Sequence, residues 1–579
     1  MDNLFRLIPV VLFSLGFLPG GIAAEPRGAN VPWTRYEAED CALSGHATVE
    51  GPSVERGTFP AESSGRKCVR LSGAGDAVEF TAKSEFAGIV IRLAIPDAPG
   101  GEGIDDTLLV TIGAREFRIP LTSKYAWQYG DEGANKGVFG NAPPAPGYTG
   151  PLARKRFDDV RQLLPESIPA GTRVKLQKPQ GGRSDWIYLD LVETEPVPPP
   201  VARPSGFLAV TDPAFGAIAD DGGDDLAVFN ACIAEAKKRH TGVYVPTGSF
   251  CISQAISVSD VVIQGAGMWH TCLLFTSAEP RGSGFLGVGG NVTVADCSVT
   301  GTTAARISTR GFSGCFGTGS TIRSVWIERV GVGAWIATYP GVAITDGLVI
   351  SHCRIRNTFA DGINFAKGTR HSVVEHCHLR GTMDDALATW SSDAERVPPT
   401  EGNVFRYNTV ENTLRAGGIG IFGGGGHEVH HNLVADTLVD GGIRFSTTFP
   451  GHKFSADSFV LVQNNTLVRC GGIAYRNKQG AVNFEVVPIM GDIQNIKISH
   501  NTIIDPSYYG VSIRSRAVDG KTSAIREVEF ADNSISGAGE YGIFVHDGAV
   551  GEISLVRTVI EHAQKGEISN QSKLEILTR

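Results

Sequence analysis

The alternation of apolar and polar positions divides the chain into two regions with different periods. Between residues 32 and 195, clusters of Gly and Pro separate short alternating runs, among them 77–81, 89–93, 108–112 and 186–192. Alternation over four to eight residues is typical of half-buried strands, and many short strands with turn residues between them are typical of a β-sandwich. We therefore predict a β-sandwich, similar to a carbohydrate-binding module, for residues 25–196.

A proline-rich segment follows this region. The run "VPPPVARP" begins at Val197 and predicts a stiff linker over residues 197–206. Beyond it, residues 224–238 have the apolar spacing of an amphipathic helix, and a strand ending in a Pro-Thr-Gly turn comes next. We expect this helix to cover the end of a solenoid, which would otherwise expose an unpaired edge.

The remainder of the chain repeats itself. One marker is a small or polar residue that opens a strand, found at Cys353, Cys377, Asn408, Asn432, Asn465, Asn501 and Asn533. The second is an x-Gly-Ile-x-apolar motif, exact or degraded, that begins at Asp361, Asp385, Gly417, Gly441, Gly471, Tyr509 and Tyr541. Two markers that advance together, with a basic coil of 24 residues and longer coils where loops are inserted, indicate a solenoid. We predict an all-β chain in which residues 207–579 form a right-handed parallel β-helix.

The first marker predicts a ladder inside the solenoid. Equivalent residues of neighbouring coils lie about 4.8 Å apart in stacked strands, so Asn side chains can hydrogen-bond from coil to coil. Cys353 and Cys377 are interpreted as two reduced members of that ladder, with a disulfide as the alternative. Among the ten cysteines, Cys41 with Cys68 and Cys232 with Cys251 are candidate disulfide pairs by proximity in sequence.

The same repeat brings three acids together. Asp361 and Asp385 are one uninterrupted coil apart, so their carboxylates should be neighbours, and Asp384 comes from the adjoining bend. Like charges at that distance should raise at least one pKa toward neutrality. Such a cluster suits general acid and base catalysis of glycoside hydrolysis. A calcium site and ordinary solvated turns are the alternatives.

The outward positions of the Gly-Ile strands predict a substrate surface. Between the two inward apolar residues of each motif lie mostly small side chains, which would form a shallow strip: Asn364, Ala388, Gly420, Arg444, Ala474 and Ser512. Asn364 and Arg444 are candidate sugar contacts, and the candidate stacking rings are Trp390, Phe422, Tyr475 and Tyr508. His427 lies in a Gly-rich turn where backbone can approach a ligand closely. A purely structural role is the alternative for each.

Composition and charge narrow the partners. The formal net charge of −9 argues against nucleic acid and against a strongly anionic polymer, so we expect a neutral polysaccharide, no membrane contact and a monomer. The apolar run from Leu7 to Leu18, followed by small residues up to Ala24, predicts a signal peptide over residues 1–24. We therefore expect a secreted or periplasmic protein. No later stretch is long and apolar enough to predict a membrane span.

The segments that carry the candidate chemistry resemble a known family. "RIRNTFADGINF", "MDDALATWS" and "GIGIFGG" are similar to glycoside hydrolase family 87, the α-1,3-glucanases and mycodextranases. "SSGRKCVRLSGAGDAVEFT", "SKYAWQYG" and "IPAGTRVKLQ" look like the sandwich that accompanies its catalytic domain. The resemblance therefore covers most of residues 32–560.

The resemblance implies an inverting, endo-acting hydrolase of α-1,3-linked or mixed-linkage α-glucan that needs no cofactor. By motif, its aspartate triad falls on Asp361, Asp384 and Asp385, and by analogy with polygalacturonases Asp384 is the acid while the other two activate water. Met383 and Arg444 depart from the family pattern and leave the linkage preference open.

The sandwich also resembles carbohydrate-binding modules that hold a structural calcium. The matching acids would be Glu37, Glu39 and Asp190, with surface acids on edge strands as the alternative interpretation.

Two other functions use the same fold. A polysaccharide lyase or uronate epimerase acts on anionic sugars, which three acids in an acidic protein would repel, since those reactions need cationic or metal help. A glycan-binding adhesin without catalysis would leave the clustered aspartates without a purpose.

Overall fold

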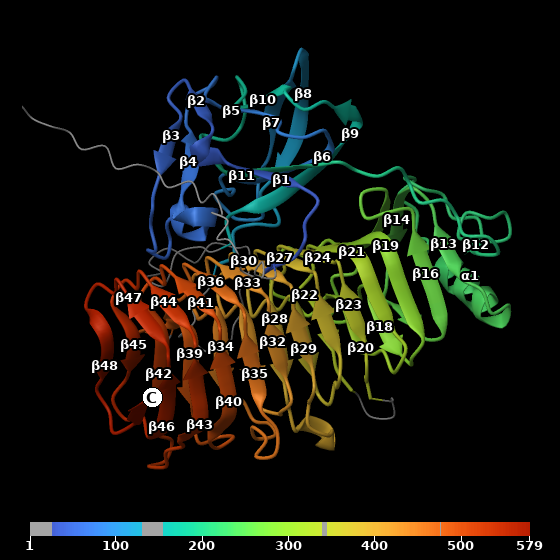
Figure 1. The fold of residues 1–579 in the computed structure, drawn as a ribbon. Helices are drawn as coiled ribbons and strands as arrows, with labels where there is room; N and C mark the ends of the chain where they lie inside the picture. Colours follow the sequence, from blue (N-terminus) through green and yellow to red (C-terminus); the bar gives the residue numbers. More distant parts are fainter. Residues whose placement is uncertain (1–25, 130–154, 339–343, 475) are drawn as a thin grey trace, which may run out of the picture.

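The computed structural model describes residues 26–129, 155–338, 344–474 and 476–579. An antiparallel β-sandwich lies on one side of a long parallel β-helix (Figure 1). The predicted all-β architecture is confirmed. The proposed leader at residues 1–24 lies outside the described residues. None of the helices in the described part of the chain is long and apolar enough to cross a membrane.

The sandwich consists of two antiparallel sheets. One contains, in the order of pairing, β3 (Thr48–Glu50), β4 (Cys68–Leu71), β11 (Ile187–Glu195), β6 (Phe86–Ala94) and β9 (Asp158–Ile168), with β1 (Thr34–Glu37) also paired to β11. The other contains β2 (Ala42–Ser44), β5 (Ala77–Thr81), β10 (Arg173–Gln177), β7 (Asp105–Ile112) and β8 (Arg115–Thr122). Alternate residues of both sheets form one aliphatic core, which includes Ile89, Ile91, Leu108, Val110 and Leu189.

Parallel strands of the β-helix pair from coil to coil. The broad outer sheet carries the candidate site and consists of β15 (Ile256–Val258), β18 (Phe285–Val288), β20 (Arg310–Cys315), β22 (Val332–Ile336), β25 (Ile363–Ala366), β28 (Leu387–Trp390), β31 (Ile419–Phe422), β34 (Ile443–Ser446), β39 (Gly480–Val486), β42 (Tyr509–Ser515), β45 (Tyr541–Val545) and β48 (Gly566–Asn570). A second, folded sheet runs from β12 (Leu208–Ala209) to β49 (Glu575–Thr578) and closes the other sides of each coil.

Helix α1 (Leu226–Lys238) covers the first coil, as predicted (Figure 1). Its buried residues Phe229, Cys232, Ile233 and Ala236 join the apolar core of the solenoid. Because the helix packs over β12 and β13 (Val243–Val245), it shields the end of the core at which the coils begin.

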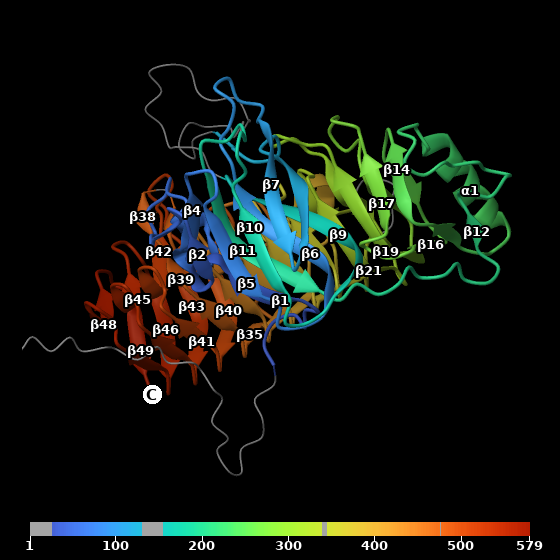
Figure 2. The same ribbon diagram turned by 90° about the horizontal axis from the view of Figure 1, so that it is seen from above.

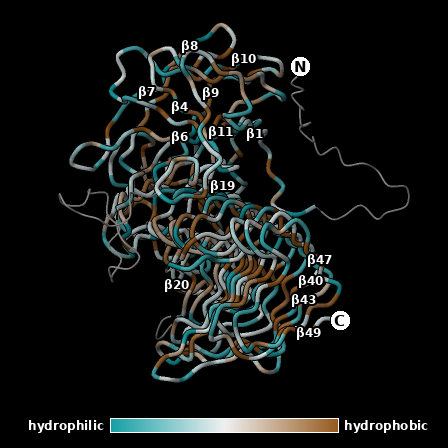
Figure 3. The backbone as a smooth tube through the Cα atoms, turned by 90° about the vertical axis from the view of Figure 1, so that its left-hand side faces the viewer, coloured by the Kyte–Doolittle hydropathy of each residue, from teal (hydrophilic) through white to brown (hydrophobic). Residues whose placement is uncertain are grey.

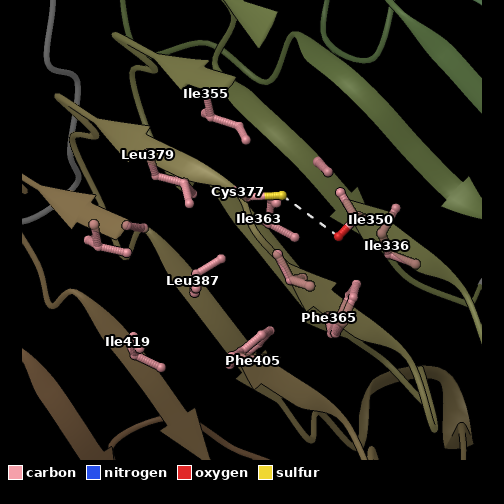
Figure 4. Packing of buried hydrophobic residues seen from close by; sticks show 14 of the residues in the cluster. Ile336, Ile350, Ile355, Ile363, Phe365, Cys377, Leu379, Leu387, Phe405 and Ile419 are labelled. Carbon is pink, nitrogen blue, oxygen red and sulfur yellow. Dashed lines mark hydrogen bonds between the residues drawn. The ribbon is translucent and has the colours of Figure 1, made fainter. Parts of the chain in front are cut away.

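Inside the solenoid, equivalent apolar residues stack in rows. Ile363, Leu387 and Ile419 follow one another on the outer sheet, facing Ile355 and Leu379 across the interior (Figure 4). Hydrophobic positions recur in the same way on successive coils near β40 (Ile493–Ser499) and β43 (Ile525–Ala531) (Figure 3). This periodic burial is the main source of stability that the sequence repeat encodes.

The predicted Asn ladder is confirmed. The backbone N–H of Asn408 donates to Oδ1 of Asn432 at 2.9 Å, and the same bond links Asn432 to Asn465 at 3.0 Å and Asn465 to Asn501 at 2.9 Å. Cys377 donates its backbone N–H to Oδ1 of Asn408 in the same row. Each side chain thus satisfies a buried backbone donor at a turn where regular pairing is interrupted.

All ten cysteines are free thiols. Cys353 and Cys377 stack as reduced members of the ladder, with the Cys353 N–H directed at the Cys377 sulfur at 3.4 Å. The Cys377 thiol lies in the core and donates to the carbonyl of Ile350 (Figure 4). The candidate pairs Cys41 with Cys68 and Cys232 with Cys251 are wrong, because these residues serve as buried or half-buried packing groups.

The sandwich lies across short strands on the side of the solenoid (Figures 1 and 2). These strands are β24 (Arg354–Arg356), β27 (His378–Arg380), β30 (Thr409–Glu411) and β33 (Leu433–Ala435). Arg380 is fully buried and pairs with Asp159 at 2.7 Å and Glu193 at 2.6 Å, while Arg354 pairs with Glu195 at 2.7 Å. Buried ion pairs therefore connect the two parts of the chain.

The proline-rich segment is fastened to the solenoid. Val201 donates its N–H to the carbonyl of Ala266 at 2.8 Å and accepts a hydrogen bond from the Tyr244 hydroxyl at 2.6 Å. The domain boundaries at residues 196 and 206 stay predictions, although β11 ends at Glu195 and β12 begins at Leu208.

One coil of the predicted repeat is wrong. The motif beginning at Gly471 places Ile473 and Ala474 in β37 (Ile473–Ala474), which pairs antiparallel with β38 (Asn477–Lys478) outside the solenoid. The strand that continues the outer sheet is β39, where Asn483 pairs with Arg444. A hairpin inserted in this coil carries a Gly-Ile pair similar to that of the true strands, and the motif cannot distinguish the two.

Candidate active site

Three aspartates converge at the amino ends of two neighbouring strands. Asp361 lies two residues before β25, and Asp384 and Asp385 lie just before β28. Gly362 donates its N–H to the carbonyl of Asp385 at 3.0 Å, which places Asp361 and Asp385 in register on adjacent coils. One carboxylate oxygen from each of the three lies within 4.8 Å of the others. The predicted convergence is confirmed as geometry.

Two arginines bind one oxygen of Asp384. Arg415 donates from Nη1 to Oδ2 of Asp384 at 2.8 Å, and Arg306 makes a shorter ion pair with the same oxygen. Arg306 comes from the loop between β19 (Val292–Gly301) and β20, and Arg415 from the loop between β30 and β31. The cluster therefore contains two guanidinium groups as well as three carboxylates.

The arginines separate the proton affinities of the three acids. Burial raises the pKa of Asp361 to about 7, with the negative charge of Asp384 adding to the effect. The pKa of Asp385 is also raised, by burial first and by Asp384 second. Burial acts in the same sense on Asp384, but Arg306 and Arg415 outweigh it and lower its pKa. Near neutral pH, Asp384 is ionised and a proton resides on Asp361 or Asp385.

Two glycines of the next coil pack against the carboxylate of Asp385. Gly417 donates its N–H to Oδ1 of Asp385 at 2.8 Å. A Cβ atom at Gly420 would lie 3.0 Å from Oδ2 of Asp385 and 2.7 Å from the ring of Phe422. The carboxylate fits because both positions lack side chains.

A cavity of about 220 Å³ opens at Asp384 and Asp385. Its further lining comes from Arg306, Arg415, Ala416, Val439, Asp440, Arg444, Phe449 and Ala474. The Phe449 ring is 43% exposed, and its centroid lies 6.2 Å from that of Trp390 and 5.6 Å from that of Phe422. Trp390 in turn contacts Trp335 at 6.1 Å. Aromatic rings thus extend from the acids along the outer sheet.

The strip of outward residues exists, but it is not exposed as predicted. Asn364, Ala388, Gly420 and Arg444 pair in register on successive strands, yet all four are buried. The acids and the loops between strands cover them. Asn364 lies with the triad and donates from Nδ2 to Oδ1 of Asp361 at 3.1 Å.

Arg444 is held by acidic side chains, and its contact with sugar stays a prediction. It pairs with Asp440 at 2.9 Å and with Glu485 at 2.5 Å, and it lines the cavity next to Asp385. Its positive charge lowers the proton affinity of Asp385, opposing the effect of burial. The prediction of a sugar contact was based on side-chain type, whereas the structure gives Arg444 acidic partners.

His427 lies away from the aspartates, in the interior. Its Nδ1 accepts the backbone N–H of Asn403 at 3.3 Å, and burial lowers its pKa to about 4. It is a rung of an interior ladder, because Asn403 in turn accepts the N–H of Ser372. Tyr475 lies outside the described residues, and Tyr508 lies beneath the ammonium group of Lys478 at 5.1 Å.

The acids predicted to bind calcium do not form a cluster comparable to the triad. Among the described residues, the only set of three or more metal-ligating side chains that converge is that of the three aspartates. Asp190 is buried with both oxygens engaged, one by the Ser64 N–H at 2.9 Å and one by Arg92. One oxygen each of Glu37 and Glu39 is buried without a hydrogen-bond partner in the described part of the chain, and burial raises the pKa of both to about 7. The calcium site itself stays a prediction.

Three site residues escaped sequence reasoning. Arg306 lies in a loop without any marker, and Phe449 lies in a loop that folds back over the outer sheet. Arg415 could have been noticed, because it precedes the motif of Gly417 by two residues and follows a ladder position by seven. Only the three-dimensional path of the loops places these side chains next to the acids.

The arrangement suits acid and base chemistry better than a divalent cation. Oδ2 of Asp384 is already occupied by two guanidinium groups, and the cluster is nearly balanced in charge. A cation site would instead leave its carboxylate oxygens free for the ion. A protonated acid beside an ionised carboxylate is what hydrolysis of a glycosidic bond requires.

Comparison with known proteins agrees with the geometry. A family model described as α-1,3-glucanase catalytic domain D1 matches residues 30–197, and its companion D2 matches residues 227–553. No curated protein matches the chain.

Solved structures cover nearly the whole chain. The Agl-KA catalytic domain is 29% identical with a TM-score of 0.88, over 96% of this chain and 100% of that one. A GH87 α-1,3-glucanase catalytic domain in complex with nigerose is 25% identical with a TM-score of 0.81, over 95% and 99%. The catalytic unit of a thermostable GH87 α-1,3-glucanase from Streptomyces thermodiastaticus strain HF3-3 is 27% identical with a TM-score of 0.78, over 95% and 96%.

Proposed function

Because the chain belongs to glycoside hydrolase family 87, the family of α-1,3-glucanase catalytic domains, we propose that it hydrolyses the α-1,3-glucosidic bonds of an α-1,3-glucan or a mixed-linkage α-glucan. The observation that carries the proposal is the contact of three aspartates within 4.8 Å, with their proton affinities separated by Arg306 and Arg415. A similar catalytic domain binds nigerose, a disaccharide with this linkage.

We propose an inverting reaction. One carboxyl group protonates the leaving oxygen while an ionised carboxylate activates water on the other side of the anomeric carbon. With three acids, two are available to hold the water. The raised pKa values of Asp361 and Asp385 place the proton on one of these two acids.

The assignment of Asp384 as the general acid stays a prediction, and it requires that Asp384 become protonated when substrate binds. Arg306 and Arg415 lower the pKa of Asp384, so this acid is ionised where the two guanidinium groups bind it. It can deliver a proton only after a bound sugar displaces these guanidinium groups and the carboxylate takes up the proton of its neighbours. If the arginines stay in place, Asp361 or Asp385 is the acid and Asp384 activates water.

Two buried polar atoms without partners support a proposal for the binding of sugar hydroxyls. Oδ1 of Asn364 and Nε1 of Trp390 have no hydrogen-bond partner in the described part of the chain. One is an acceptor and the other a donor, and both lie on the strands that carry the triad. The exposed ring of Phe449 adds a face for stacking on a pyranose.

The test is a panel of neutral α- and β-glucans incubated with the wild type, Asp384→Asn and Asp393→Asn. Asp393 is exposed and lies eight residues beyond Asp385, so its variant controls for loss of a nearby charge. We expect new reducing ends from α-1,3-glucan with the wild type and Asp393→Asn but not with Asp384→Asn. NMR of the first product should show the β-anomer.

Other results of the glucan panel would favour one of the two alternative functions, a lyase or an adhesin. Products that absorb in the ultraviolet would indicate a lyase, and tight glycan binding without new reducing ends would indicate an adhesin. Azide separates the two roles, because a small anion can replace the attacking water only where the proton donor is intact. A variant that azide rescues has lost the base, and a variant that it does not rescue has lost the acid.

Export, a monomeric state and a calcium ion held by Glu37 and Glu39 complete the proposal. Sequencing of the mature amino terminus, sedimentation, and thermal unfolding with and without a chelator test these three points separately.

A further inference from the structure

The sandwich contacts each of the segments that carry the catalytic cluster. Ala61 packs with Met383, the residue before Asp384, in a small apolar cluster. The ammonium group of Lys155 lies 4.1 Å from the ring centroid of Phe359, two residues before Asp361. Gln128 donates from Nε2 to the carbonyl of Ala304 at 2.9 Å, two residues before Arg306. The sandwich is therefore in position to act on the site.

The loop that bears Arg306 is hydrogen-bonded to its surroundings mainly at its base. Thr303 donates its N–H to the carbonyl of Arg329 at 3.2 Å, and Thr309 accepts the N–H groups of Gly331 and Val332, each at 2.9 Å. Residues 302–309 connect β19 to β20 without secondary structure. The Thr303 and Thr309 hydroxyls bond to each other at 2.6 Å, which closes the base of the loop, and Ser308 accepts the Arg281 N–H at 2.8 Å. Gln128 is the sandwich side chain bonded to the tip, and it is almost fully buried.

The tip decides where the guanidinium of Arg306 lies. From residue 306, just before β20, the side chain reaches Oδ2 of Asp384, just before β28, three strands further along the outer sheet. Arg306 is itself mostly buried, and the charge of Asp384 helps to keep its pKa raised. A shift of the tip would remove one of the two cations on Asp384.

We propose that Gln128 of the sandwich is a positioning residue for the hydrolytic site, which holds the carbonyl of Ala304 and thereby keeps the Arg306 guanidinium on Asp384. The inference rests on the proposed hydrolysis for its kinetic consequence, but not for its structural one. The sandwich would then be a working part of the active site, besides any affinity it has for sugar.

The consequence is a shift in the ionisation of Asp384. The charged groups that face this carboxylate are Asp361, Asp385, Arg306 and Arg415, with Arg444 and Asp440 further along the cavity. Loss of one cation from this set makes the ionised form of Asp384 less favourable, so it accepts a proton at higher pH. The acid limb of kcat/KM should follow, because it reports the free enzyme.

The experiment compares Gln128→Leu with Gln177→Leu in the full chain. Gln177 also donates from its side chain to a backbone carbonyl, that of Gly75 at 3.1 Å, within the sandwich alone. We expect Gln128→Leu to move the acid limb up by about half a pH unit, and to speed amide hydrogen exchange in residues 302–309. Gln177→Leu should do neither.

A double-mutant cycle tests the route through Arg306. Arg306→Ala should shift the limb further, and adding Gln128→Leu to it should have no additional effect on the limb. An unchanged limb and unchanged exchange in Gln128→Leu, or additive shifts, would overturn the proposal. If Gln128→Leu fails to fold, Gln128→Met, which keeps the length of the side chain but has no donor and no charge, takes its place.

Failure of the proposed hydrolysis can be distinguished from failure of the positioning role of Gln128. If the wild type releases no reducing ends from any α-glucan, hydrolysis is wrong. Exchange of residues 302–309, together with a crystal structure of Gln128→Leu that shows whether Arg306 has left Asp384, then decides the positioning role without turnover.

Discussion

Asp385 lies beside Asp361 one coil further along the solenoid, and both carboxyl groups have raised pKa values while Asp384 between the two arginines has a lowered one. This pattern follows from burial of two acids next to a third that is already ionised. It is a costly arrangement for the fold, and its cost depends on pH.

The first prediction concerns stability and pH. The folded state binds the proton of Asp361 with a pKa of about 7, against an ordinary value of 3.8. Its contribution is therefore complete below about pH 4 and is lost as the pH rises through 7. We expect the free energy of unfolding to fall over this window by on the order of 1 kcal/mol per pH unit.

Asp361→Asn should remove much of this fall, since an amide does not titrate. Chemical denaturation at several pH values measures the effect, with Asp393→Asn as the control that keeps the wild-type slope. Equal slopes for Asp361→Asn and the wild type would contradict the raised pKa.

A second prediction concerns Gly420, which packs against the carboxylate of Asp385. In Gly420→Ala the new Cβ lies 3.0 Å from Oδ2 of Asp385, so the carboxylate must shift. A displacement of about 1 Å at a reacting group can reduce turnover by about 100-fold. We expect kcat to fall by about 10- to 100-fold while the protein stays folded. Gly100→Ala, where nothing lies within 4 Å of the added Cβ, should keep full activity.

The contact between sandwich and solenoid supplies a third prediction. Arg380 is fully buried and bound to Asp159 and Glu193, so Arg380→Ala takes one buried cation from each of these acids, which keep Arg356 and Arg35 as partners. We expect a loss of about 3–5 kcal/mol in the free energy of unfolding. Arg173→Ala breaks the exposed pair with Glu79 and should cost about 0–1 kcal/mol. Similar losses in both variants would show that the interface pair is not desolvated.

The fourth prediction concerns the Asn ladder inside the solenoid. Asn432→Ala removes the acceptor of the Asn408 N–H and the donor to the carbonyl of Phe405. Buried groups left without partners cost about 1–3 kcal/mol each, so the midpoint of denaturation should fall clearly. Asn30→Ala at an exposed position is the control. A midpoint equal to that of the control would mean that water replaces the ladder.

The last prediction follows from the free thiols. Because none of the ten cysteines is paired, a reducing agent should leave Tm unchanged. Alkylation after denaturation without reductant should modify all ten. A fall of Tm in reductant would reveal a disulfide.

The repeat in the sequence determined the coil, the ladder and the meeting of Asp361 with Asp385. Register in a β-helix is set by a local rule: residues one coil apart in sequence are neighbours in space. A spacing of 24 residues without an inserted loop is therefore enough to place two side chains. The same rule failed at Gly471, where a hairpin copies the motif but leaves the stack.

Tertiary structure alone decided the charges around the acids. Arg306 and Arg415 come from loops of other coils, and Gln128 comes from the sandwich, more than 170 residues before Ala304. Loop paths and domain packing follow no repeat, so the sequence does not reveal which cation reaches which carboxylate. A pKa depends on burial and on neighbours within a few ångströms, and for that reason the ionisation of Asp384 could be found only in three dimensions.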